Sequence, residues 1–328
     1  MLWGIKNIKM ISILCPCYNE EEALPSFRRE VTRVMEETGE PFEIVFVNDG
    51  SDDGTLDIMR ALAQQDPRIV VVDLSRNFGK EAALTAALDH ARGDAVVPMD
   101  ADLQDPPALI PEMIARWRDG YDVVLAKRDD RPGDTYAKRS SAGAFYRLFN
   151  KCAQTKIPEN VGDFRLMDRR VVDAVGALRE RNRFMRGIFA WAGFRTCTVS
   201  FERERRSAGE TKFGVSMMWR TAMDAMASFC PRPLTLWLYI GAAVSLASFA
   251  YGAYIIVRTL LLGRDVPGYA SLLCLVLFFG GLQTLGIGIL GEYLGRTYVE
   301  SKRRPIYLVR EVYGAGKKNS GTNARSEI

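Results

Sequence analysis

Two carboxylates stand one residue apart at Asp100-Ala101-Asp102, directly after an apolar stretch. Carboxylate oxygens are ligands that hard divalent cations prefer, and a cation held in this way can also bind a pyrophosphate. The pair therefore predicts a site for a metal-bound nucleoside diphosphate. A lone Asp-x-Asp sequence is more often a solvated turn, so the prediction depends on what the neighbouring segments contribute.

Two other segments carry side chains suited to a nucleotide. Asp49, within Asn48-Asp49-Gly50, could accept a hydrogen bond from a nucleobase edge or from ribose, although the same residues also form ordinary turns. The segment 76–80, Arg-Asn-Phe-Gly-Lys, combines bases with a flexible glycine, which suits phosphates near the start of a helix. Helix capping is the alternative explanation of this segment.

The elements that must position these residues follow an alternating pattern. Short apolar runs at 10–14, 43–47, 69–72 and 95–99 predict buried strands, and helical spacing at 22–37, 55–65 and 81–91 predicts a helix between each pair. Such alternation predicts an α/β domain with a largely parallel sheet. Ligands of such sheets bind beyond the carboxyl ends of the strands, where the candidate residues follow.

The last third of the chain has a different composition from the rest. Hydrophobic residues make up 48% of the 328 residues and charged residues 26%, but the apolar residues crowd into two uncharged segments, 234–257 and 269–290. Each is long enough to predict a transmembrane helix, with a pair of buried core helices as the alternative. The basic residues after the second segment predict a hairpin with both ends in the cytoplasm. We therefore expect a multi-pass protein of the inner (plasma) membrane with its catalytic domain in the cytoplasm.

Flanking segments add to the expected membrane contact. The stretches 138–151 and 213–228 mix bases with aromatic residues and methionines, which is typical of helices lying in the membrane interface and equally of amphipathic core helices. Gly291 and Gly295 form a GxxxG spacing that predicts close helix packing and permits a homo-oligomer. Glu292 is a candidate functional residue because an ionisable group at that depth needs a partner or water.

Composition excludes several classes of function. The single histidine, His90, excludes a histidine-based zinc site and a Ser-His-Asp triad. The formal net charge of +4 is too small to indicate nucleic acid as a partner. Six cysteines without a CxxC pair favour reduced thiols in a cytosolic setting. Any metal must therefore be held by oxygen ligands.

The sequence resembles the family 2 glycosyltransferases, and within them the polyisoprenyl-phosphate glycosyltransferases with two C-terminal membrane helices. The resemblance runs from Ile11 to Val309. It is carried by the segments 16–20 (Pro-Cys-Tyr-Asn-Glu), 48–51, 100–107, 206–213, 291–296 and 302–307. It implies a GT-A (Rossmann-like) catalytic domain over 1–212, an interfacial region over 213–233, two transmembrane helices within 234–298 and a basic cytoplasmic tail over 299–328.

The resemblance also implies roles for individual residues. It places Mg²⁺ or Mn²⁺ on Asp102 and Gln104, and it makes Asp163, in Gly162-Asp163-Phe164-Arg165, an active-site acid that orients the donor sugar or the acceptor. An N-cap of a helix is the alternative for Asp163. The donor side is implied to comprise Pro16, Tyr18, Glu20, Asp49, Lys80, Asp100, Ala101, Arg128 and Arg203. The acceptor phosphate is implied to meet Arg139, Arg206 and Lys212. Related sequences often carry a serine where this chain has Ala142.

The expected reaction is inverting transfer of a hexose to a polyisoprenyl phosphate such as undecaprenyl phosphate, with glucose from UDP-glucose as the first choice of donor. A lipid phosphate is already an anion, so placement and charge suffice for catalysis without a general base. GDP-mannose and a UDP-hexosamine remain alternative donors. A processive polysaccharide synthase is disfavoured because the chain lacks the QxxRW sequence, and a non-catalytic membrane adaptor is disfavoured because the acidic set is intact.

Overall fold

A computed structural model describes residues 9–128, 161–181, 183–201, 232–262 and 268–314. The first half of the chain alternates strands and helices. The strands are β1 (Ile11–Cys17), β2 (Phe42–Asn48), β3 (Ile69–Leu74) and β4 (Ala95–Pro98), and the helices between them are α1 (Leu24–Thr38), α2 (Thr55–Gln65) and α3 (Lys80–His90). A short 3-10 turn, η1 (Pro107–Leu109), leads into α4 (Ile110–Arg118). All seven predicted elements are confirmed, with ends shifted by at most three residues.

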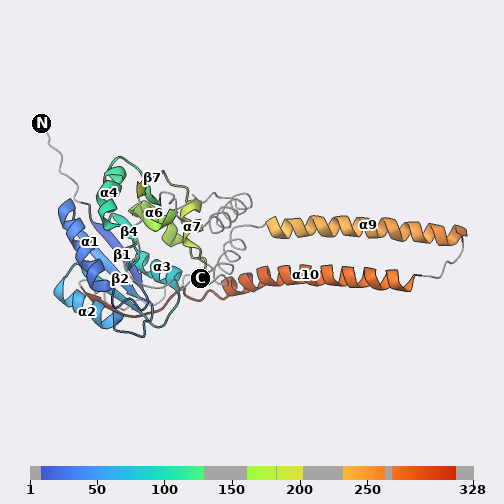
Figure 1. Cartoon of the computed structure of the whole chain (residues 1–328), viewed down its shortest axis with the longest axis horizontal. Helices are drawn as coiled ribbons and strands as arrows, with labels where there is room; N and C mark the ends of the chain where they lie inside the picture. Colours follow the sequence, from blue (N-terminus) through green and yellow to red (C-terminus); the bar gives the residue numbers. More distant parts are fainter. Residues whose placement is uncertain (1–8, 129–160, 182, 202–231, 263–267, 315–328) are drawn as a thin grey trace, which may run out of the picture.

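The second half of the domain contributes elements that the sequence pattern did not predict. These are β5 (Val123–Arg128), β6 (Val161–Asp168), α6 (Arg169–Ala177), α7 (Met185–Trp191) and β7 (Thr196–Phe201). Two long helices follow, α9 (Arg232–Leu262) and α10 (Tyr269–Ser301), and the chain then returns to the domain as β8 (Val309–Gly314). Figure 1 shows α9 and α10 projecting side by side from the α/β domain.

The strands form one mixed sheet of eight in the order β7-β5-β6-β4-β1-β2-β3-β8. Neighbours from β4 to β3 are parallel, whereas β6 runs antiparallel to β4 and to β5, and β8 runs antiparallel to β3. The carboxyl ends of β1 to β4 consequently meet at one edge of the sheet. The α/β class expected from the sequence is confirmed.

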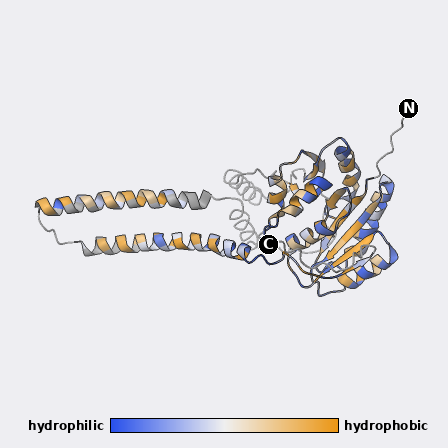
Figure 2. Ribbon diagram, turned by 180° about the vertical axis from the view of Figure 1, so that it is seen from behind, coloured by the Kyte–Doolittle hydropathy of each residue, from blue (hydrophilic) through white to orange (hydrophobic). Residues whose placement is uncertain are grey.

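Helices cover both faces of the sheet, because successive side chains along each strand point to opposite faces. Ile13 packs with the helices of one face, which include α1 and α4, while its neighbour Leu14 packs with α3, α6 and α7 on the other. Both side chains are fully buried. Figure 2 shows the resulting band of apolar residues along the strands, with hydrophilic residues on the outer sides of the helices.

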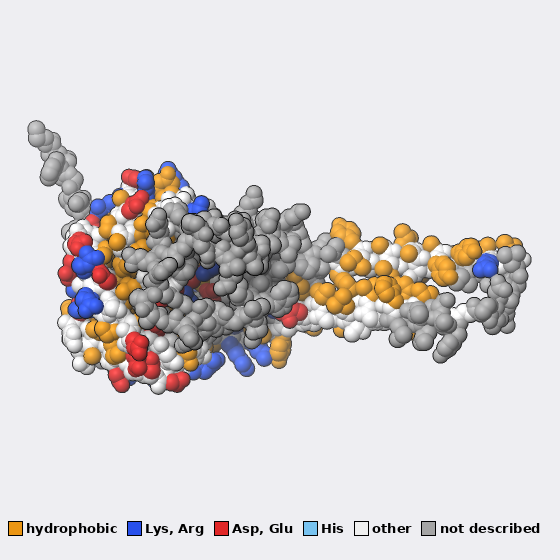
Figure 3. Space-filling view, viewed as in Figure 1, with side chains coloured by type: hydrophobic (Ala, Val, Ile, Leu, Met, Phe, Trp, Pro, Cys, Tyr) orange, Lys and Arg blue, Asp and Glu red, His pale blue; other side chains and the backbone are white. Residues whose placement is uncertain are grey.

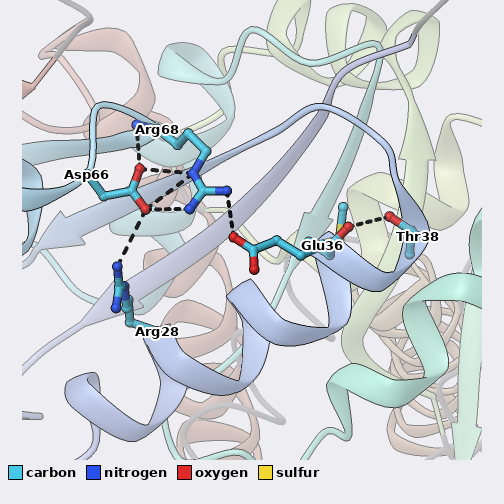
Figure 4. A network of polar contacts seen from close by, with 6 residues as sticks. Arg28, Glu36, Thr38, Asp66 and Arg68 are labelled. Carbon is cyan, nitrogen blue, oxygen red and sulfur yellow. Dashed lines mark hydrogen bonds and ion pairs between the residues drawn. The ribbon is translucent and has the colours of Figure 1, made fainter.

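A cluster of polar side chains lies just before the start of β3. Arg68 donates to the Asp66 carboxylate through Nε at 2.9 Å and Nη2 at 2.8 Å, and to Glu36 of α1 at 3.1 Å (Figure 4). Arg28 of the same helix lies 3.6 Å from Asp66. The hydrogen bonds from Arg68 hold the pKa of Asp66 below its usual value despite its partial burial. The cluster therefore links α1 to β3, the strand that pairs with the edge strand β8.

The two long helices present apolar side chains to their surroundings. Leu246 and Phe249 of α9 and Leu294 of α10 are each at least 70% exposed, and Figure 3 shows apolar side chains spread along this pair. The helices touch where Trp237 of α9 lies against Gly286 of α10, at a position that leaves no room for a Cβ atom. Within the described ranges, however, no helix combines the length and the apolar character that a membrane span needs. The two predicted spans, 234–257 and 269–290, are therefore not supported by the structure.

The features expected at the end of α10 have a different environment from the one predicted. Cβ atoms placed on Gly291 and Gly295 would meet open space, so among the described residues this spacing does not pack against α9. Self-association through it stays a prediction. Glu292 pairs with Arg296 one turn later, at 2.7 Å, so an ion pair along the helix partners its charge.

Candidate active site

The candidate site lies at the edge of the sheet where β1, β2, β3 and β4 end. Two of the loops there are cross-linked by their own polar groups. The backbone N–H of Asn19, after β1, donates to Ser51 Oγ at 3.1 Å, and Asn19 Oδ1 accepts from the backbone of Asp52 at 3.0 Å. Asn19 adopts φ +56, a left-handed conformation that asparagine tolerates better than most residues. Pro16, Tyr18 and Glu20 lie in or beside this loop, and Tyr18 is 45% exposed.

Asp49 organises the loop that follows β3. Its carboxylate is buried and accepts the backbone N–H groups of Phe78 at 2.7 Å and Gly79 at 2.9 Å. Burial raises the pKa of Asp49, while these two hydrogen bonds and the nearby Arg76 act against the rise. The structure thus brings Asp49 to the expected edge and gives it a role that the sequence did not reveal, namely holding the 77–79 segment in place.

Gly50 is required at the point where these loops cross. Its φ is +66, and a Cβ atom there would collide with the backbone of Arg76 and Asn77. Residues with side chains rarely adopt that conformation, and the neighbouring backbone leaves no space for one. The close approach of β2 and the 76–79 segment therefore depends on this glycine.

A chain of charges crosses the site from α3 to α7. The ammonium group of Lys80 lies 2.6 Å from Asp100 Oδ1 and 3.2 Å from Asp163 Oδ2, and Arg186 Nε lies 3.0 Å from Asp163 Oδ1. Lys80 starts α3, Asp100 follows β4, Asp163 is in β6 and Arg186 is in α7. Residues from the 80–100 region and from β6 and α7, more than 60 residues further along the chain, therefore meet at one set of ionised groups.

This arrangement keeps Asp163 ionised. Burial alone would raise the pKa of Asp163, but Arg186 and Lys80 outweigh it and hold the pKa well below its usual range. For Lys80, burial alone would lower the pKa, and the Asp100 and Asp163 carboxylates raise it above its usual value. The N-cap alternative for Asp163 does not hold, since the residue lies within β6 and the cap of α6 is Asp168. Asp163 can act as a fixed negative charge or hydrogen-bond acceptor, but it is a poor proton acceptor.

Three residues of this region were not singled out as site residues by the sequence reasoning: Arg186, Arg165 and Glu81. The guanidinium of Arg165 is buried, donates to Gly162 O at 2.7 Å and lies 4.4 Å from the centre of the Phe189 ring. Burial lowers the pKa of Arg165 to about 10. Glu81 accepts from the backbone N–H of Met185 at 3.3 Å, and burial together with Asp163 raises its pKa to about 7. Only the fold brings these groups together, although Arg165 belongs to the segment that marked Asp163.

The residues expected to hold a divalent cation are suited to one. Asp102 is exposed, and its carboxylate accepts the backbone N–H of Gln104 at 3.2 Å. Between them Leu103 adopts φ +54, a conformation rare for leucine. The side-chain nitrogen of Gln104 is buried without a hydrogen-bond partner, and as a donor it suits an acceptor such as a phosphate oxygen rather than the cation itself.

The protein supplies only part of a coordination sphere. In the described part of the chain no three histidine, cysteine, aspartate or glutamate side chains group closely enough to hold a metal ion. Oxygens of Asp102 and Gln104 fit Mg²⁺ or Mn²⁺ only if phosphate oxygens or water complete the shell. The site therefore suits a cation that arrives with a phosphorylated ligand. Ala101, between the two carboxylates, is buried.

The remaining predicted residues are five bases: Arg128, Arg139, Arg203, Arg206 and Lys212. Arg128 ends β5. Arg139, Arg203, Arg206 and Lys212 lie outside the described residues. Most of the predicted interfacial region, 213–233, also lies outside them. Their assignment to the donor pyrophosphate and to the acceptor phosphate stays a prediction.

Relatives at high identity cover nearly the whole chain. A prophage bactoprenol glucosyl transferase homolog from Escherichia coli is 50% identical over 302 residues, covering 92% of this chain and 99% of that protein. A bactoprenol glucosyl transferase from Shigella phage SfV is 51% identical over 300 residues, covering 92% and 98%. An uncharacterized glycosyltransferase from Synechocystis is 49% identical over 304 residues, covering 93% and 96%.

Solved structures show weaker similarity. A mannosyltransferase from Pyrobaculum calidifontis, in complex with GDP-Man and Mn²⁺, has a TM-score of 0.45 at 20% identity and covers 91% of this chain and 88% of that one. Glucosyl-3-phosphoglycerate synthase from Mycobacterium tuberculosis, in complex with Mn²⁺, UDP and glucosyl-3-phosphoglycerate, has a TM-score of 0.43 at 19% identity and covers 69% of this chain and 83% of that one.

The family assignment follows from the sequence comparisons and agrees with the geometry at the sheet edge. Residues 12–176 match Glycosyl transferase family 2, and this range contains β1 to β4, the Asp100–Gln104 segment and Asp163. The site brings together acidic and basic side chains in an arrangement suited to a phosphorylated donor. The chain is an enzyme that belongs to glycosyl transferase family 2.

Proposed function

We propose that this glycosyltransferase moves glucose from UDP-glucose to a polyisoprenyl phosphate such as undecaprenyl phosphate, with inversion at the anomeric carbon. The observation that carries the proposal is the set of charges at the sheet edge, in which the carboxylates of Asp100 and Asp163 meet Lys80 and Arg186. The printed names of relatives at about 50% identity, bactoprenol glucosyl transferases, support the choice of sugar and acceptor.

The donor diphosphate would lie against Asp100, Asp102 and Gln104. Asp102 and Gln104 would hold a divalent cation, which would supply positive charge to neutralise the departing diphosphate. Lys80 contributes a second positive charge beside Asp100. Asp49 holds the 77–79 segment by accepting hydrogen bonds from its backbone. The position of Asp49 after β2 suits contact with the nucleoside.

The reaction requires no strong base. An oxygen of the acceptor phosphate forms the new bond to the anomeric carbon, the bond from that carbon to the diphosphate breaks, and the electron pair leaves with UDP. Because the acceptor is already an anion, the fixed negative charge of Asp163 serves to orient the sugar and to balance the charge of Lys80 and Arg186. A single displacement inverts the anomeric configuration.

We also propose that the α9–α10 pair contacts the lipid in which the acceptor resides, with the catalytic domain on the cytoplasmic side of the inner membrane. The exposed apolar side chains of both helices support this location, since apolar surface of this extent is unfavourable in water. Flotation of the purified protein with vesicles tests it. A variant with Leu246, Phe249 and Leu260 changed to serine should remain at the bottom of the gradient, and flotation equal to wild type would contradict the proposal.

Transfer of radiolabelled sugar tests the reaction itself. Purified full-length protein is incubated with undecaprenyl phosphate, Mn²⁺ and one labelled donor per reaction. The donors are UDP-glucose, GDP-mannose and UDP-N-acetylglucosamine. We expect label in a lipid product from UDP-glucose alone, with loss of the label when the metal is chelated. Transfer from GDP-mannose or the hexosamine would replace the donor, and no transfer from any donor would favour the adaptor alternative.

A further inference from the structure

The strand that follows the two long helices, β8, pairs with β3, whose carboxyl end lies at the candidate site. β8 pairs antiparallel with β3, from Val70 opposite Gly314 to Leu74 opposite Val309, with an irregularity between Asp73 and Leu74. Beyond β3 the pairing continues, because the backbone N–H of Ser75 donates to Leu308 O at 2.9 Å. The segment that begins at Ser75 is the one that Asp49 holds three and four residues later, at Phe78 and Gly79.

Arg310 of β8 joins this region through two contacts. Its Nη2 donates to Ser75 O at 2.8 Å, and its Nη1 lies 3.4 Å from Asp73 Oδ2. Asp73 is fully buried, whereas the Arg310 side chain is 58% exposed, so Arg310 reaches inward from the surface to a buried carboxylate. A planar guanidinium can serve both acceptors at once, which an ammonium group cannot do in the same way.

The contacts continue from Asp73 to the candidate donor site. Asn48 Nδ2 donates to Asp73 Oδ1 at 2.7 Å, and Asn48 Oδ1 accepts the backbone N–H of Ser51 at 3.1 Å. Asn48 directly precedes Asp49, whose carboxylate holds Phe78 and Gly79. Arg310 is therefore two hydrogen-bonded steps from Asn48, the last residue of β2, and three steps from Ser51 in the loop that follows. It is one step from Ser75, at the start of the loop after β3.

We infer that Arg310 is a positioning residue for the nucleotide of the donor, acting through Asp73 and the Ser75 carbonyl on the Asn48–Asp49 and 75–79 segments. The inference rests on the proposed function. Without Arg310 the Asp73 carboxylate keeps Asn48 as a partner but loses its cation, and the carbonyl of Ser75 loses a charged donor. Nucleotide binding should weaken, because both segments that would meet the nucleoside become less ordered.

The chemical step should be spared. The groups assigned to it, Lys80, Asp100 and Asp163, make their contacts with α7 and with one another rather than with β8. Loss of Arg310 is therefore expected to raise the KM for the nucleotide sugar with little change in kcat. A general loss of folding would reduce kcat and the amount of active protein as well, so the two explanations give different results.

The same stretch of chain carries α10. The helix ends at Ser301, and Arg181, in the loop before α7, donates to Glu300 Oε2 from its backbone at 3.0 Å and contacts the carbonyls of Glu300 and Arg304 at 2.5 Å each. Tyr307 then donates to Asp89 at the end of α3, at 2.8 Å. The short segment between α10 and the end of β8 therefore contacts both the end of α10 and the sheet edge that carries the candidate donor site.

The test measures UDP binding by calorimetry, and KM and kcat for UDP-glucose, with full-length protein in detergent. The variants are Arg310→Ala, Arg310→Lys, Asp73→Asn and the double variant Arg310→Ala with Asp73→Asn. Arg33→Ala is the matched control, since Arg33 also pairs with a carboxylate, Glu37 at 2.7 Å, but on the surface of α1. Thermal unfolding identifies any variant that is not folded.

We expect Arg310→Ala to weaken UDP binding and raise KM about tenfold, with kcat within about twofold of wild type, while Arg33→Ala behaves as wild type. Arg310→Lys should recover part of the affinity, and the double variant should be no weaker than the worse single variant. UDP binding by wild type together with unchanged binding by Arg310→Ala and Arg310→Lys would overturn the inference alone. Failure of wild type to bind UDP would overturn the proposed donor and the inference together.

Discussion

Lys80 Nζ lies 3.2 Å from Asp163 Oδ2, although Lys80 begins α3 and Asp163 lies in β6 on the far side of β4. The contact joins the half of the domain that carries the strand ends to the half that carries α7. Because Lys80 also binds Asp100, a single ammonium group compensates two carboxylates that would otherwise repel each other.

Replacing Lys80 by alanine should therefore reduce turnover about 100-fold or more, because it removes a cation from a preorganised, partly desolvated site. Lys80→Arg should retain part of the activity, since it keeps the charge. The comparison is made in the radiolabel assay at saturating UDP-glucose. Arg116→Ala, which removes a surface pair with Glu112, is the control. Turnover of Lys80→Ala near that of the control would exclude Lys80 from the chemical step.

Asp102→Ala should abolish most turnover and should also weaken binding of Mn²⁺, which electron paramagnetic resonance measures without reference to activity. The expected loss of rate is about 100-fold to 1000-fold, as for the removal of a group that stabilises charge in the transition state. Asp173→Ala, on the surface of α6, is the control. If Asp102→Ala bound Mn²⁺ as wild type does, the proposed metal ligand would be wrong.

The raised pKa of Glu81 predicts that the free energy of unfolding falls as the pH rises. Its folded-state pKa is about 7, above the ordinary value of 4.5, so the folded protein binds more protons than the unfolded chain between these values. The contribution is therefore fully present below about pH 4.5 and is lost as the pH rises through 7. Over that interval it amounts to at most about 1.4 kcal/mol per pH unit, and less where water reaches the carboxyl group.

Unfolding of Glu81→Gln and wild type across pH 4.5 to 8 measures this contribution as a difference. We expect wild type to lose stability relative to Glu81→Gln as the pH rises to 7, and the difference to become constant above it. Asp163 should contribute nothing to this difference, because its pKa lies well below the interval. A difference that is the same at every pH would show that the Glu81 pKa is not raised.

Gly50→Ala should destabilise the protein by about 2 kcal/mol and should weaken UDP binding strongly. The new Cβ would meet the backbone of Arg76 and Asn77, and alanine disfavours the φ of +66. Gly39→Ala is the matched control, because Gly39 has a similar φ of +69 but open space around its Cβ position. Equal UDP binding by the two variants would indicate that close approach at Gly50 is unimportant for the site.

The elements of the first hundred residues could be predicted because each is a local pattern. The four buried strands are continuous apolar runs, and α1 and α2 have a clear helical period, whereas α3 is buried on all sides from Ala82 to Leu88. β6 and β8 could not be predicted in this way. The segments Val-Gly-Asp-Phe-Arg-Leu-Met-Asp and Val-Arg-Glu-Val-Tyr-Gly are strands because of partners far along the chain, and β8 resembled part of a basic tail.

The site shows the same division. Lys80, Asp100 and Asp102 follow or precede regular elements, so their positions could be inferred from the rule that ligands bind beyond strand ends. Arg186 and Glu81 give no such signal, since their significance comes from contacts between α3, β6 and α7 that local spacing does not encode. Arg310 is a further case, because in the sequence it is one of several bases after α10.

The position of β8 has a consequence for how the enzyme is made. Until β8 has left the ribosome, the edge of β3 has no partner, and an unpaired apolar strand such as Ile69–Leu74 is a site for aggregation. Because α9 and α10 precede β8, the sheet is completed only after both helices have been synthesised. Fragments cut before α9 to simplify crystallisation would leave that edge bare, and a nucleotide-binding domain separated from its helices would be incomplete by construction.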